Sequence, residues 1–196
     1  MPERVTSAGR LVVISGPSGV GKTTVCEEVL RRLPAAMLSV SMTTRPPRSG
    51  ERDGENYRFV TAEAFQRQED AGKLLEHAVY QGNRYGTPAE PVERAIAAGR
   101  QVVLEIDVQG GMQIAERMPD ALRVFIEPPS DDVLRARLIG RATDPPEVQE
   151  KRLAAARDEI ELAHSSGAYQ HFVINDVVDE TADAIVRLLQ PESTQA

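Results

Sequence analysis

A short apolar strand that runs directly into a glycine-rich turn constrains this chain more than any other feature. Residues 11–14 (LVVI) are apolar and mostly β-branched, which is typical of a strand buried on both faces. Residues 16–23 (GPSGVGKT) then match the pattern G-x-x-x-x-G-K-[ST] in full, and a helix is expected from Lys22 to Leu33. This strand–loop–helix unit predicts a binding site for the phosphates of a nucleoside triphosphate.

Residues 16–24, here called the phosphate-binding loop, have the chemistry of an anion site. Glycines let successive backbone N–H groups point toward one centre without a Cβ in the way. The N-terminus of the helix adds a partial positive charge, Lys22 adds a full one, and the Thr23 hydroxyl is a candidate ligand for Mg²⁺. The residues expected to bind the triphosphate are Gly16, Pro17, Ser18, Gly19, Val20, Gly21, Lys22, Thr23 and Thr24.

The composition narrows the remaining possibilities. A chain of 196 residues with 41% hydrophobic residues is long enough for one sizeable domain with its own core. Its net charge of −7 argues against a general nucleic-acid binder, and no apolar run approaches the length of a membrane span. The polar start of the chain offers no signal peptide, and a single cysteine, Cys26, excludes a disulfide framework, so we expect a cytoplasmic protein.

Strand and helix patterns alternate along most of the chain. Apolar runs at 101–107, 122–126 and 171–175 are expected to be strands, and a helical pattern follows each of them. With the first strand in front, this order predicts an α/β fold with a doubly wound parallel sheet of about five strands. The ligand of such a sheet binds at the carboxyl ends of its strands. A long, highly charged helix at 147–163 is expected to be an outer element.

Residues 36–88 depart from this alternation, because they contain short strands and turns. A strand is expected at 38–41, and strands at 74–80 and 83–85 are expected to form a hairpin around Gln81-Gly82. We therefore expect an inserted small mixed α/β subdomain and a helical lid. The expected division is a core of residues 10–35, 89–136 and 166–190, a subdomain of residues 36–88, a lid of residues 137–165, and flexible tails of residues 1–9 and 191–196.

Two arginines lie on a loop that prolines stiffen. Pro46 and Pro47 stand between Arg45 and Arg48 and forbid a helix there. A stiff loop loses less entropy when its arginines grip an anion, and arginine holds phosphate oxygens bidentately. The alternative interpretation is a solvated turn with two surface arginines.

Several further motifs occur in one order along the chain, and together they are far more specific than the phosphate-binding loop. They are residues 41–48 (SMTTRPPR), Gly50-Glu51, Asp53-Gly54, Tyr57, Glu76, Tyr85-Gly86-Thr87, residues 105–110 (EIDVQG) and Arg137-x3-Arg141. With the loop, they make the chain resemble the guanylate kinase family from about Arg10 to Leu189. The resemblance implies transfer of the γ-phosphoryl group of ATP to GMP or dGMP with Mg²⁺, giving ADP and GDP.

The resemblance also assigns a GMP site, and the assignment makes chemical sense. Guanine presents N1–H and N2–H donors, which suit carboxylates, and an O6 acceptor, which suits hydroxyls. By resemblance, Glu76 and Asp107 take the donors. The hydroxyls of Ser41 and Thr87 take O6. The phosphate of GMP is expected to bind Arg45, Arg48, Tyr57 and Tyr85.

Several of these residues have another interpretation. Thr87 opens a capping box with Pro88 at the first helical position, so it is expected to cap the helix that follows, with or without a role at the base. Glu76 could simply face solvent from its strand. Asp107 ends an apolar strand, where a carboxylate can instead organise Mg²⁺. Alternation along that strand is expected to point Glu105 and Asp107 to opposite faces.

The resemblance places a lid over the phosphates. Arg137 and Arg141 are four residues apart and share one helix face, where a bound polyphosphate would relieve the repulsion between like charges. Arg152 follows a break at Pro145-Pro146, which makes the lid loop stiffer than is usual in the family, and Ala142 replaces a usual glycine. The groups expected to act in catalysis are Lys22, Arg45, Arg137, Arg141 and Arg152.

Two other functions stay open on this information. A guanylate-kinase-like protein-interaction module would share the fold without catalysis, although such modules typically lack a working phosphate-binding loop. A related kinase of a phosphorylated sugar would need the loop but not Glu76, Thr87 and Asp107 together. The expected partners are ATP and GMP or dGMP, without nucleic acid or membrane, and no oligomeric state is predicted. Asn175 is expected near the adenine of ATP or, alternatively, in a turn.

Overall fold

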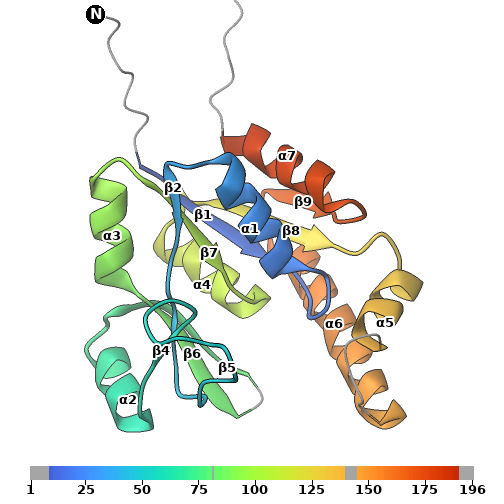
Figure 1. Ribbon diagram of the computed structural model, residues 1–196, viewed down its shortest axis with the longest axis horizontal. Helices are drawn as coiled ribbons and strands as arrows, with labels where there is room; N and C mark the ends of the chain where they lie inside the picture. Colours follow the sequence, from blue (N-terminus) through green and yellow to red (C-terminus); the bar gives the residue numbers. More distant parts are fainter. Residues whose placement is uncertain (1–8, 81, 140–144, 190–196) are drawn as a thin grey trace, which may run out of the picture.

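A five-stranded parallel sheet with helices on both faces forms the centre of the structure, and a smaller four-stranded sheet stands beside it (Figure 1). The computed structural model describes residues 9–80, 82–139 and 145–189. The large sheet has the order β2 (Ala36–Leu38), β7 (Gln101–Glu105), β1 (Leu11–Ser15), β8 (Leu122–Glu127) and β9 (His171–Ile174). Every neighbouring pair in it is parallel, which confirms the predicted doubly wound α/β fold. The helices around it are α1 (Lys22–Arg32), α3 (Ala89–Ala97), α4 (Val108–Arg117), α5 (Asp131–Ile139), α6 (Pro146–Ser166) and α7 (Val178–Leu189).

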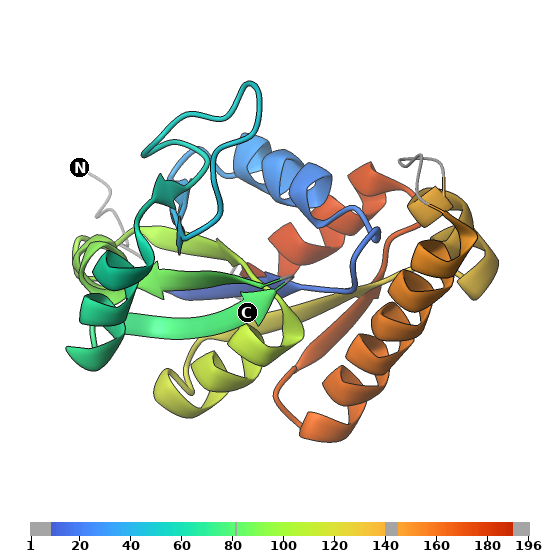
Figure 2. The same cartoon turned by 90° about the horizontal axis from the view of Figure 1, so that it is seen from below.

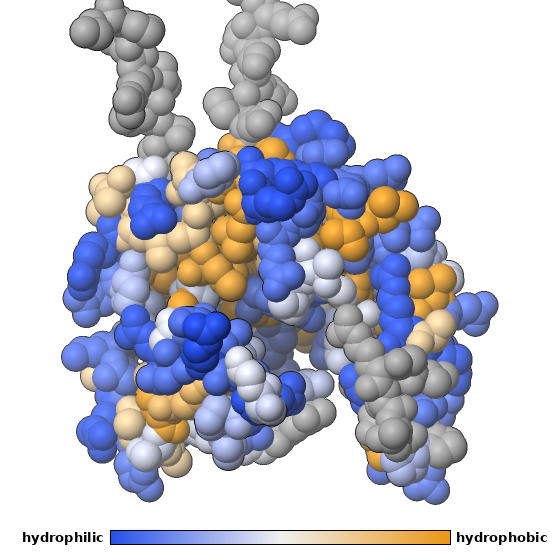
Figure 3. Space-filling model, viewed as in Figure 1, coloured by the Kyte–Doolittle hydropathy of each residue, from blue (hydrophilic) through white to orange (hydrophobic). Residues whose placement is uncertain are grey.

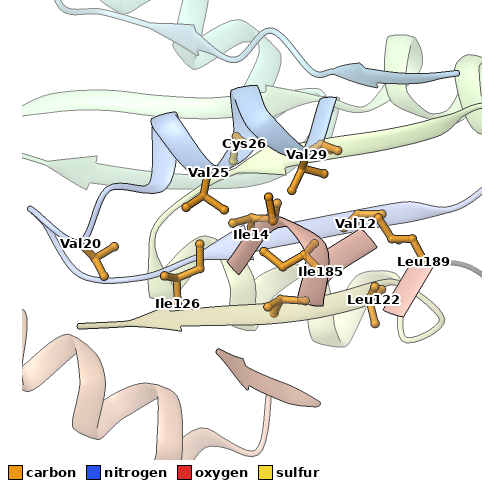
Figure 4. Packing of buried hydrophobic residues seen from close by; sticks show 13 residues of the cluster. Val12, Ile14, Val20, Val25, Cys26, Val29, Leu122, Ile126, Ile185 and Leu189 are labelled. Atoms are coloured by element: carbon orange, nitrogen blue, oxygen red, sulfur yellow. The ribbon is translucent and has the colours of Figure 1, made fainter. Parts of the chain in front are cut away.

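Alternating residues of the central strand β1 form the two faces of the core. Val12 and Ile14 pack against α1 and α7, as Figure 4 shows. Leu11 and Val13 belong to the opposite face, which packs against α3 and α4. All four side chains are at most 2% exposed. Because successive side chains of a strand point to opposite faces, this short apolar run anchors helices on both sides and holds the loop that follows it.

The second sheet belongs to the inserted subdomain. Its order is β4 (Arg58–Phe59), β3 (Met42–Thr43), β6 (Asn83–Pro88) and β5 (Leu74–Tyr80), with α2 (Ala62–Asp70) beside it. The antiparallel pair β5–β6 is the predicted hairpin, of which Gln81 lies outside the described residues. Met42, Phe65 and Leu74 form a small core within this part, so the subdomain has apolar packing of its own.

Three boundaries differ from the expectations drawn from the sequence. β2 pairs with β7, so residues 36–38 belong to the large sheet and the subdomain begins after them. The strand expected at 38–41 is wrong, because the chain leaves β2 at Leu38 and forms β3 only at Met42. The helix after Thr87 begins at Ala89 with Pro88 as its N-cap and without a side-chain cap, so the capping role expected for Thr87 is also wrong.

The pair α5–α6 lies across the molecule from the four-stranded sheet in both views (Figures 1 and 2). Leu134 and Leu138 of α5 pack with Leu153 and Ala156 of α6. The later part of α6 packs near Phe125 of the large sheet, so this charged helix is anchored on the core at one end. In the part of the chain that the structure describes, no helix combines the length and apolar character needed to cross a bilayer.

Candidate active site

A cavity of about 540 Å³ lies between the phosphate-binding loop, the subdomain and α6. Figure 3 shows the surface hollowed between the subdomain and the pair α5–α6. The cavity wall includes Gly16, Ser18, Lys22 and Thr23 of the loop, Ser41, Arg45, Arg48, Tyr57, Glu76 and Tyr85 of the subdomain, and Glu105, Asp107 and Glu159. Most of the predicted site residues therefore share one space at the carboxyl ends of the parallel strands.

The phosphate-binding loop passes from β1 to α1 in a conformation that needs glycine. Gly21 is the N-cap of α1 and has a φ of 98°, which L side chains rarely adopt. Lys22 folds over the loop, and its Nζ donates to the carbonyl oxygens of Gly16 (2.5 Å) and Pro17 (3.2 Å). Burial lowers the pKa of Lys22, while nearby carboxylates, Glu159 first, raise it. An ammonium group is thus placed beside a helix N-terminus, as phosphate binding requires.

Thr23, the predicted Mg²⁺ ligand, has a carboxylate partner. Its Oγ1 donates to Glu105 Oε1 at 2.7 Å, and Glu105 is the last residue of β7. Glu105 and Asp107 both line the cavity, so the expectation that they face opposite ways is wrong. Residues two apart in a strand point to the same face, so alternation itself favours one side for this pair, and Asp107 stands just beyond β7 at the N-cap of α4.

Three residues predicted for guanine form one hydrogen-bonded cluster. Thr87 Oγ1 donates to Glu76 Oε1 at 2.6 Å, and the Ser41 hydroxyl lies 3.3 Å from Thr87 Oγ1. The register of β5 and β6 places Glu76 opposite Thr87, and Glu76 is only 4% exposed. Glu76 therefore does not face solvent. The hydroxyl of Thr87 binds this carboxyl group, which explains why it does not cap α3.

The environment of Glu76 raises the pKa of its carboxyl group. Burial raises the pKa of Glu76 to about 7. The hydrogen bond from Thr87 lowers this pKa, whereas the negative charge of Asp107 raises it further. A carboxyl group with such a pKa changes charge near neutral pH, so its ability to accept hydrogen bonds depends on pH in the physiological range.

Asp107 has structural partners as well as a place in the cavity wall. Its Oδ1 accepts a hydrogen bond from the N–H of Gly110 at 2.8 Å and thereby caps α4. Its carbonyl oxygen accepts from the hydroxyl of Ser15 at 3.3 Å, at the end of β1. These two bonds hold the residue in place at the start of α4.

Arg45 is oriented by Glu51, which the sequence-based site prediction leaves out although Gly50-Glu51 is among the motifs. Arg45 donates to both carboxylate oxygens, with Nη2 2.8 Å from Oε1 and Nη1 3.0 Å from Oε2. The backbone N–H of Arg48 donates to the same carboxylate at 2.7 Å. The guanidinium carbon of Arg45 lies 5.5 Å from the ring centre of Tyr57, and that ring contacts Tyr85 edge to face. The residues predicted for the GMP phosphate are therefore grouped on one side of the cavity.

Helix α5, which begins within the core and enters the predicted lid at Arg137, contacts the phosphate-binding loop. Nη1 of Arg137 on α5 donates to the carbonyl oxygens of Val20 (3.2 Å) and Asn175 (3.0 Å). Arg152 is partly buried on α6, and Arg141 lies outside the described residues. Of the three predicted lid arginines, Arg137 is therefore seen to bind the loop itself.

Glu159 on α6 is a cavity residue that sequence reasoning missed. Its Oε2 accepts a hydrogen bond from the N–H of Ser18 at 3.3 Å, so α6 touches the loop directly. Burial raises the pKa of Glu159, and the charge of Lys22 lowers it. Glu159 lies seven positions after Arg152, which places both on one helix face, and this spacing is the only signal for Glu159 in the sequence.

Asn175 supports the phosphate-binding loop. Its Nδ2 donates to the carbonyl oxygen of Val20 at 2.8 Å, and its Oδ1 accepts from Thr181 Oγ1 at 3.1 Å. The residue is 2% exposed. It therefore holds the loop against the end of β9, while contact with adenine stays a prediction.

Comparisons with known proteins agree with this geometry. A family model described as guanylate kinase matches residues 8–192. A guanylate kinase of Gloeobacter violaceus is 51% identical over 183 residues, which are 93% of this chain and 88% of that protein. A guanylate kinase of Thermobifida fusca is 50% identical over 186 residues, which are 95% of this chain and 93% of that protein. The crystal structure of guanylate kinase from Anaplasma phagocytophilum is similar with a TM-score of 0.76 at 35% identity, over 93% of this chain and 85% of that one. The chain therefore belongs to the guanylate kinase family.

Proposed function

We propose that this chain transfers the γ-phosphoryl group of ATP to GMP or dGMP, giving ADP and GDP or dGDP. One observation carries the proposal: a single cavity joins the phosphate-binding loop to the hydrogen-bonded cluster of Ser41, Thr87 and Glu76. A loop suited to a triphosphate and a pocket suited to a base share one space, so two nucleotides can meet there with their phosphates between them. Membership of the guanylate kinase family supports the same reaction.

Recognition of guanine is assigned to two carboxylates and two hydroxyls. The N1–H and N2–H groups of guanine would donate to Glu76 and Asp107, and O6 would accept from Ser41 or Thr87. Adenine reverses this pattern along the same edge, so AMP would leave buried carboxylates unpaired. A site built around such hydrogen bonds rejects the wrong partner by about 10⁴-fold.

The phosphate of GMP is assigned to the arginine and tyrosine side of the cavity. Arg45 and Arg48 would grip it, and the hydroxyls of Tyr57 and Tyr85 would donate to it. Because Glu51 already holds Arg45 with two hydrogen bonds, less side-chain entropy would be lost when the phosphate binds. Arg45 is counted among the catalytic groups because it fixes the attacking phosphate in position.

Phosphoryl transfer needs positioning and charge neutralisation rather than a covalent intermediate. Lys22 and the backbone N–H groups of the loop, those of residues other than Pro17, would bind the triphosphate. In an in-line displacement, the charge on the transferring group would be neutralised by the lid arginines, Arg137, Arg141 and Arg152. Closure of a lid formed by residues 137–165 would exclude the water that otherwise hydrolyses ATP. The contact of Arg137 with the loop supports this arrangement.

Mg²⁺ is proposed as the cation that accompanies ATP, and the residues present fit it. Thr23 Oγ1 and Glu105 Oε1 lie 2.7 Å apart beside the loop and are the hard oxygen donors that Mg²⁺ prefers. Within residues 9–80, 82–139 and 145–189, no three His, Cys, Asp or Glu side chains are grouped for metal binding. This agrees with a cation that is held mainly by water and substrate phosphates. When bound, Mg²⁺ would supply positive charge to the β- and γ-phosphates.

Two finer assignments complete the proposal. The adenine of ATP would lie near Asn175, which the structure holds beside Val20 of the loop. The cytoplasm is proposed as the location, because a free and buried thiol at Cys26 suits a reducing compartment.

A coupled assay of ADP formation tests the proposed reaction. With ATP and Mg²⁺ held constant, GMP and dGMP are expected to support turnover, while AMP supports less than about 1% of that rate. Absence of GMP-dependent ADP formation would contradict the proposal. Phosphopeptide binding in its place would favour an interaction module, and faster turnover of a ribose bisphosphate would favour a sugar kinase.

A further inference from the structure

Gly110 occupies the first turn of α4, where glycine is not needed for the backbone. A glycine weakens a helix relative to alanine because it loses more backbone freedom on folding. Gly110 is buried, and it is not among the glycines with positive φ, so its conformation is open to any residue. The reason for a glycine must therefore lie in the space around its Cα.

That space is taken by Glu76. A Cβ placed on Gly110 would lie 2.7 Å from Glu76 Oε2 and 3.2 Å from Glu76 Cδ, both closer than ordinary van der Waals contact. Ile106 Cδ1 would lie 3.3 Å away and limits the room on another side. The carboxyl group of Glu76 therefore rests against the bare Cα of Gly110, and a methyl group there would displace it.

Gly110 also holds the second carboxylate of the base pocket, the proposed guanine site of Ser41, Glu76, Thr87 and Asp107. Its N–H donates to Asp107 Oδ1 at 2.8 Å. Gly110 thus binds Asp107 through its backbone N–H, and because it has no side chain it leaves room for the carboxyl group of Glu76. Two carboxylates that repel each other are kept in neighbouring positions on one cavity wall by contact with the same residue.

We infer that Gly110 is a positioning residue that sets the spacing of Glu76 and Asp107 and thereby determines selectivity for guanine. The inference rests on the proposed function, because it concerns how that site recognises its base. Guanine carries its N1–H and N2–H donors on one rigid edge, so both can be bound only if the two acceptors keep a matching separation. A displacement of about 1 Å takes a hydrogen bond of normal length beyond its useful range.

The carboxyl group of Glu76 cannot move away from a methyl group on residue 110 without weakening a hydrogen bond in the base pocket. Glu76 Oε1 is held by Thr87 at 2.6 Å, so moving Oε2 means turning or withdrawing the whole carboxyl group from that bond. The displaced atoms are the end of a side chain and not backbone, so α4 itself can accept a methyl group. Folding is therefore expected to tolerate Gly110→Ala, whereas recognition of guanine is not.

The test measures steady-state kinetics of Gly110→Ala at pH 8, with GMP and ATP varied separately. The matched control is Gln109→Ala, which changes the exposed neighbour in the same helical turn. In Gly110→Ala, KM for GMP is expected to rise by about tenfold or more, because a charged hydrogen bond to the base is lost or misdirected. KM for ATP is expected to stay within about twofold of the unchanged chain and Tm to stay the same or rise. Gln109→Ala should match the unchanged chain in all three quantities.

A second pair of variants separates this positioning effect from general damage. Glu76→Ala removes the carboxyl group that the new methyl group would displace, so adding Gly110→Ala to it should change GMP binding, measured by calorimetry, by less than about twofold. The inference is overturned if Gly110→Ala leaves KM for GMP unchanged, or if it weakens GMP binding by the same factor with and without Glu76. Lack of GMP turnover in the unchanged chain is a different result, which removes the proposed function and this inference with it.

Discussion

The two ends of the cavity are built differently for the ligands proposed to bind there. At the phosphate-binding loop, the binding groups come from one short stretch, residues 16–24, and most of them are backbone N–H groups. At the base pocket they are side chains from separate segments, and Ser41 and Thr87 are 46 residues apart in the chain. Backbone amides are the same in every sequence, so the loop recognises phosphate in general. The proposed guanine site could recognise one base, because side chains differ in their donors and acceptors.

The two ends also differ in charge. The loop combines Lys22 with the N-terminus of α1, whereas the pocket combines the carboxyl groups of Glu76 and Asp107. The partial charge of a helix N-terminus does not titrate, but burial moves the pKa of Glu76 to about 7. The base pocket is therefore the end of the cavity that should respond to pH and to the loss of one charge.

The largest expected effect is at the loop. Lys22→Ala should lower kcat by roughly a thousandfold, because it removes a preorganised positive charge from the transferring group. GMP binding, measured by calorimetry, should stay within about twofold, because the base pocket is untouched. Lys73→Ala, at an exposed position, is the control. Near-normal turnover of Lys22→Ala would contradict the assignment of the loop as the triphosphate site, and the contrast between the two ends of the cavity would no longer hold.

At the other end, Glu76→Gln should lower kcat/KM for GMP by about a hundredfold, because the amide turns NH₂ donors toward the donors of guanine. The dissociation constant of ATP should not change. Glu93→Gln, an exposed glutamate on α3, is the matched control. Equal losses with GMP and ATP would remove Glu76 from the base pocket and show that the two ends are not independent.

The same carboxyl group should make stability depend on pH. The pKa of Glu76 is about 7 in the folded chain, against an ordinary value of 4.5, so between these pH values the folded state binds the proton more tightly. Its contribution to the free energy of unfolding is therefore fully present below pH 4.5 and is lost as pH rises through 7, by about 3 kcal/mol. Because part of the loss already occurs below pH 5, urea unfolding at pH 5 and pH 8 should show the free energy of unfolding of Glu76→Gln rising by about 2.5 kcal/mol relative to that of the unchanged chain. A shift in the other direction would mean that Glu76 is not held in an apolar environment.

The smallest expected effect is the pH dependence of GMP use. An ionised Glu76 is needed to accept from guanine, so KM for GMP should rise about tenfold between pH 8 and pH 6, while KM for ATP changes much less. In Glu76→Gln, the pH dependence of KM for GMP should shrink to the part caused by the phosphate of GMP itself, whose second pKa is about 6. Identical pH profiles for the two chains would show that Glu76 does not set this dependence.

The phosphate-binding end could be predicted from the sequence in detail. Its strand, turn and helix are consecutive, and each depends on local properties such as β-branching, the freedom of Gly21 and the start of α1. The parallel sheet also follows from the order of elements, since parallel strands need helical crossovers. That Asp107 caps α4 depends on where β7 stops, which the apolar pattern does not show.

The base pocket could be predicted only through the resemblance to guanylate kinases. Without it, Glu76 has the pattern of a solvent-facing strand residue and Thr87 the pattern of a helix cap. Their hydrogen bond exists because β5 and β6 pair in one register, which places the two residues opposite each other. The spacing of Glu159 from Arg152 and the place of Gly110 in a family motif do not show what these residues do, because their roles depend on contacts with Ser18 and Glu76 from distant segments.

By itself, the sequence determined that this chain has a phosphate-binding loop on an α/β sheet, and its motifs identified the family. Only the tertiary structure decided which carboxyl groups share the cavity, which of them is buried enough to titrate near pH 7, and which residue contacts two of them at once. The physical reason is that local backbone conformation follows from neighbouring residues, whereas burial, charge repulsion and close packing arise between segments that meet only after folding.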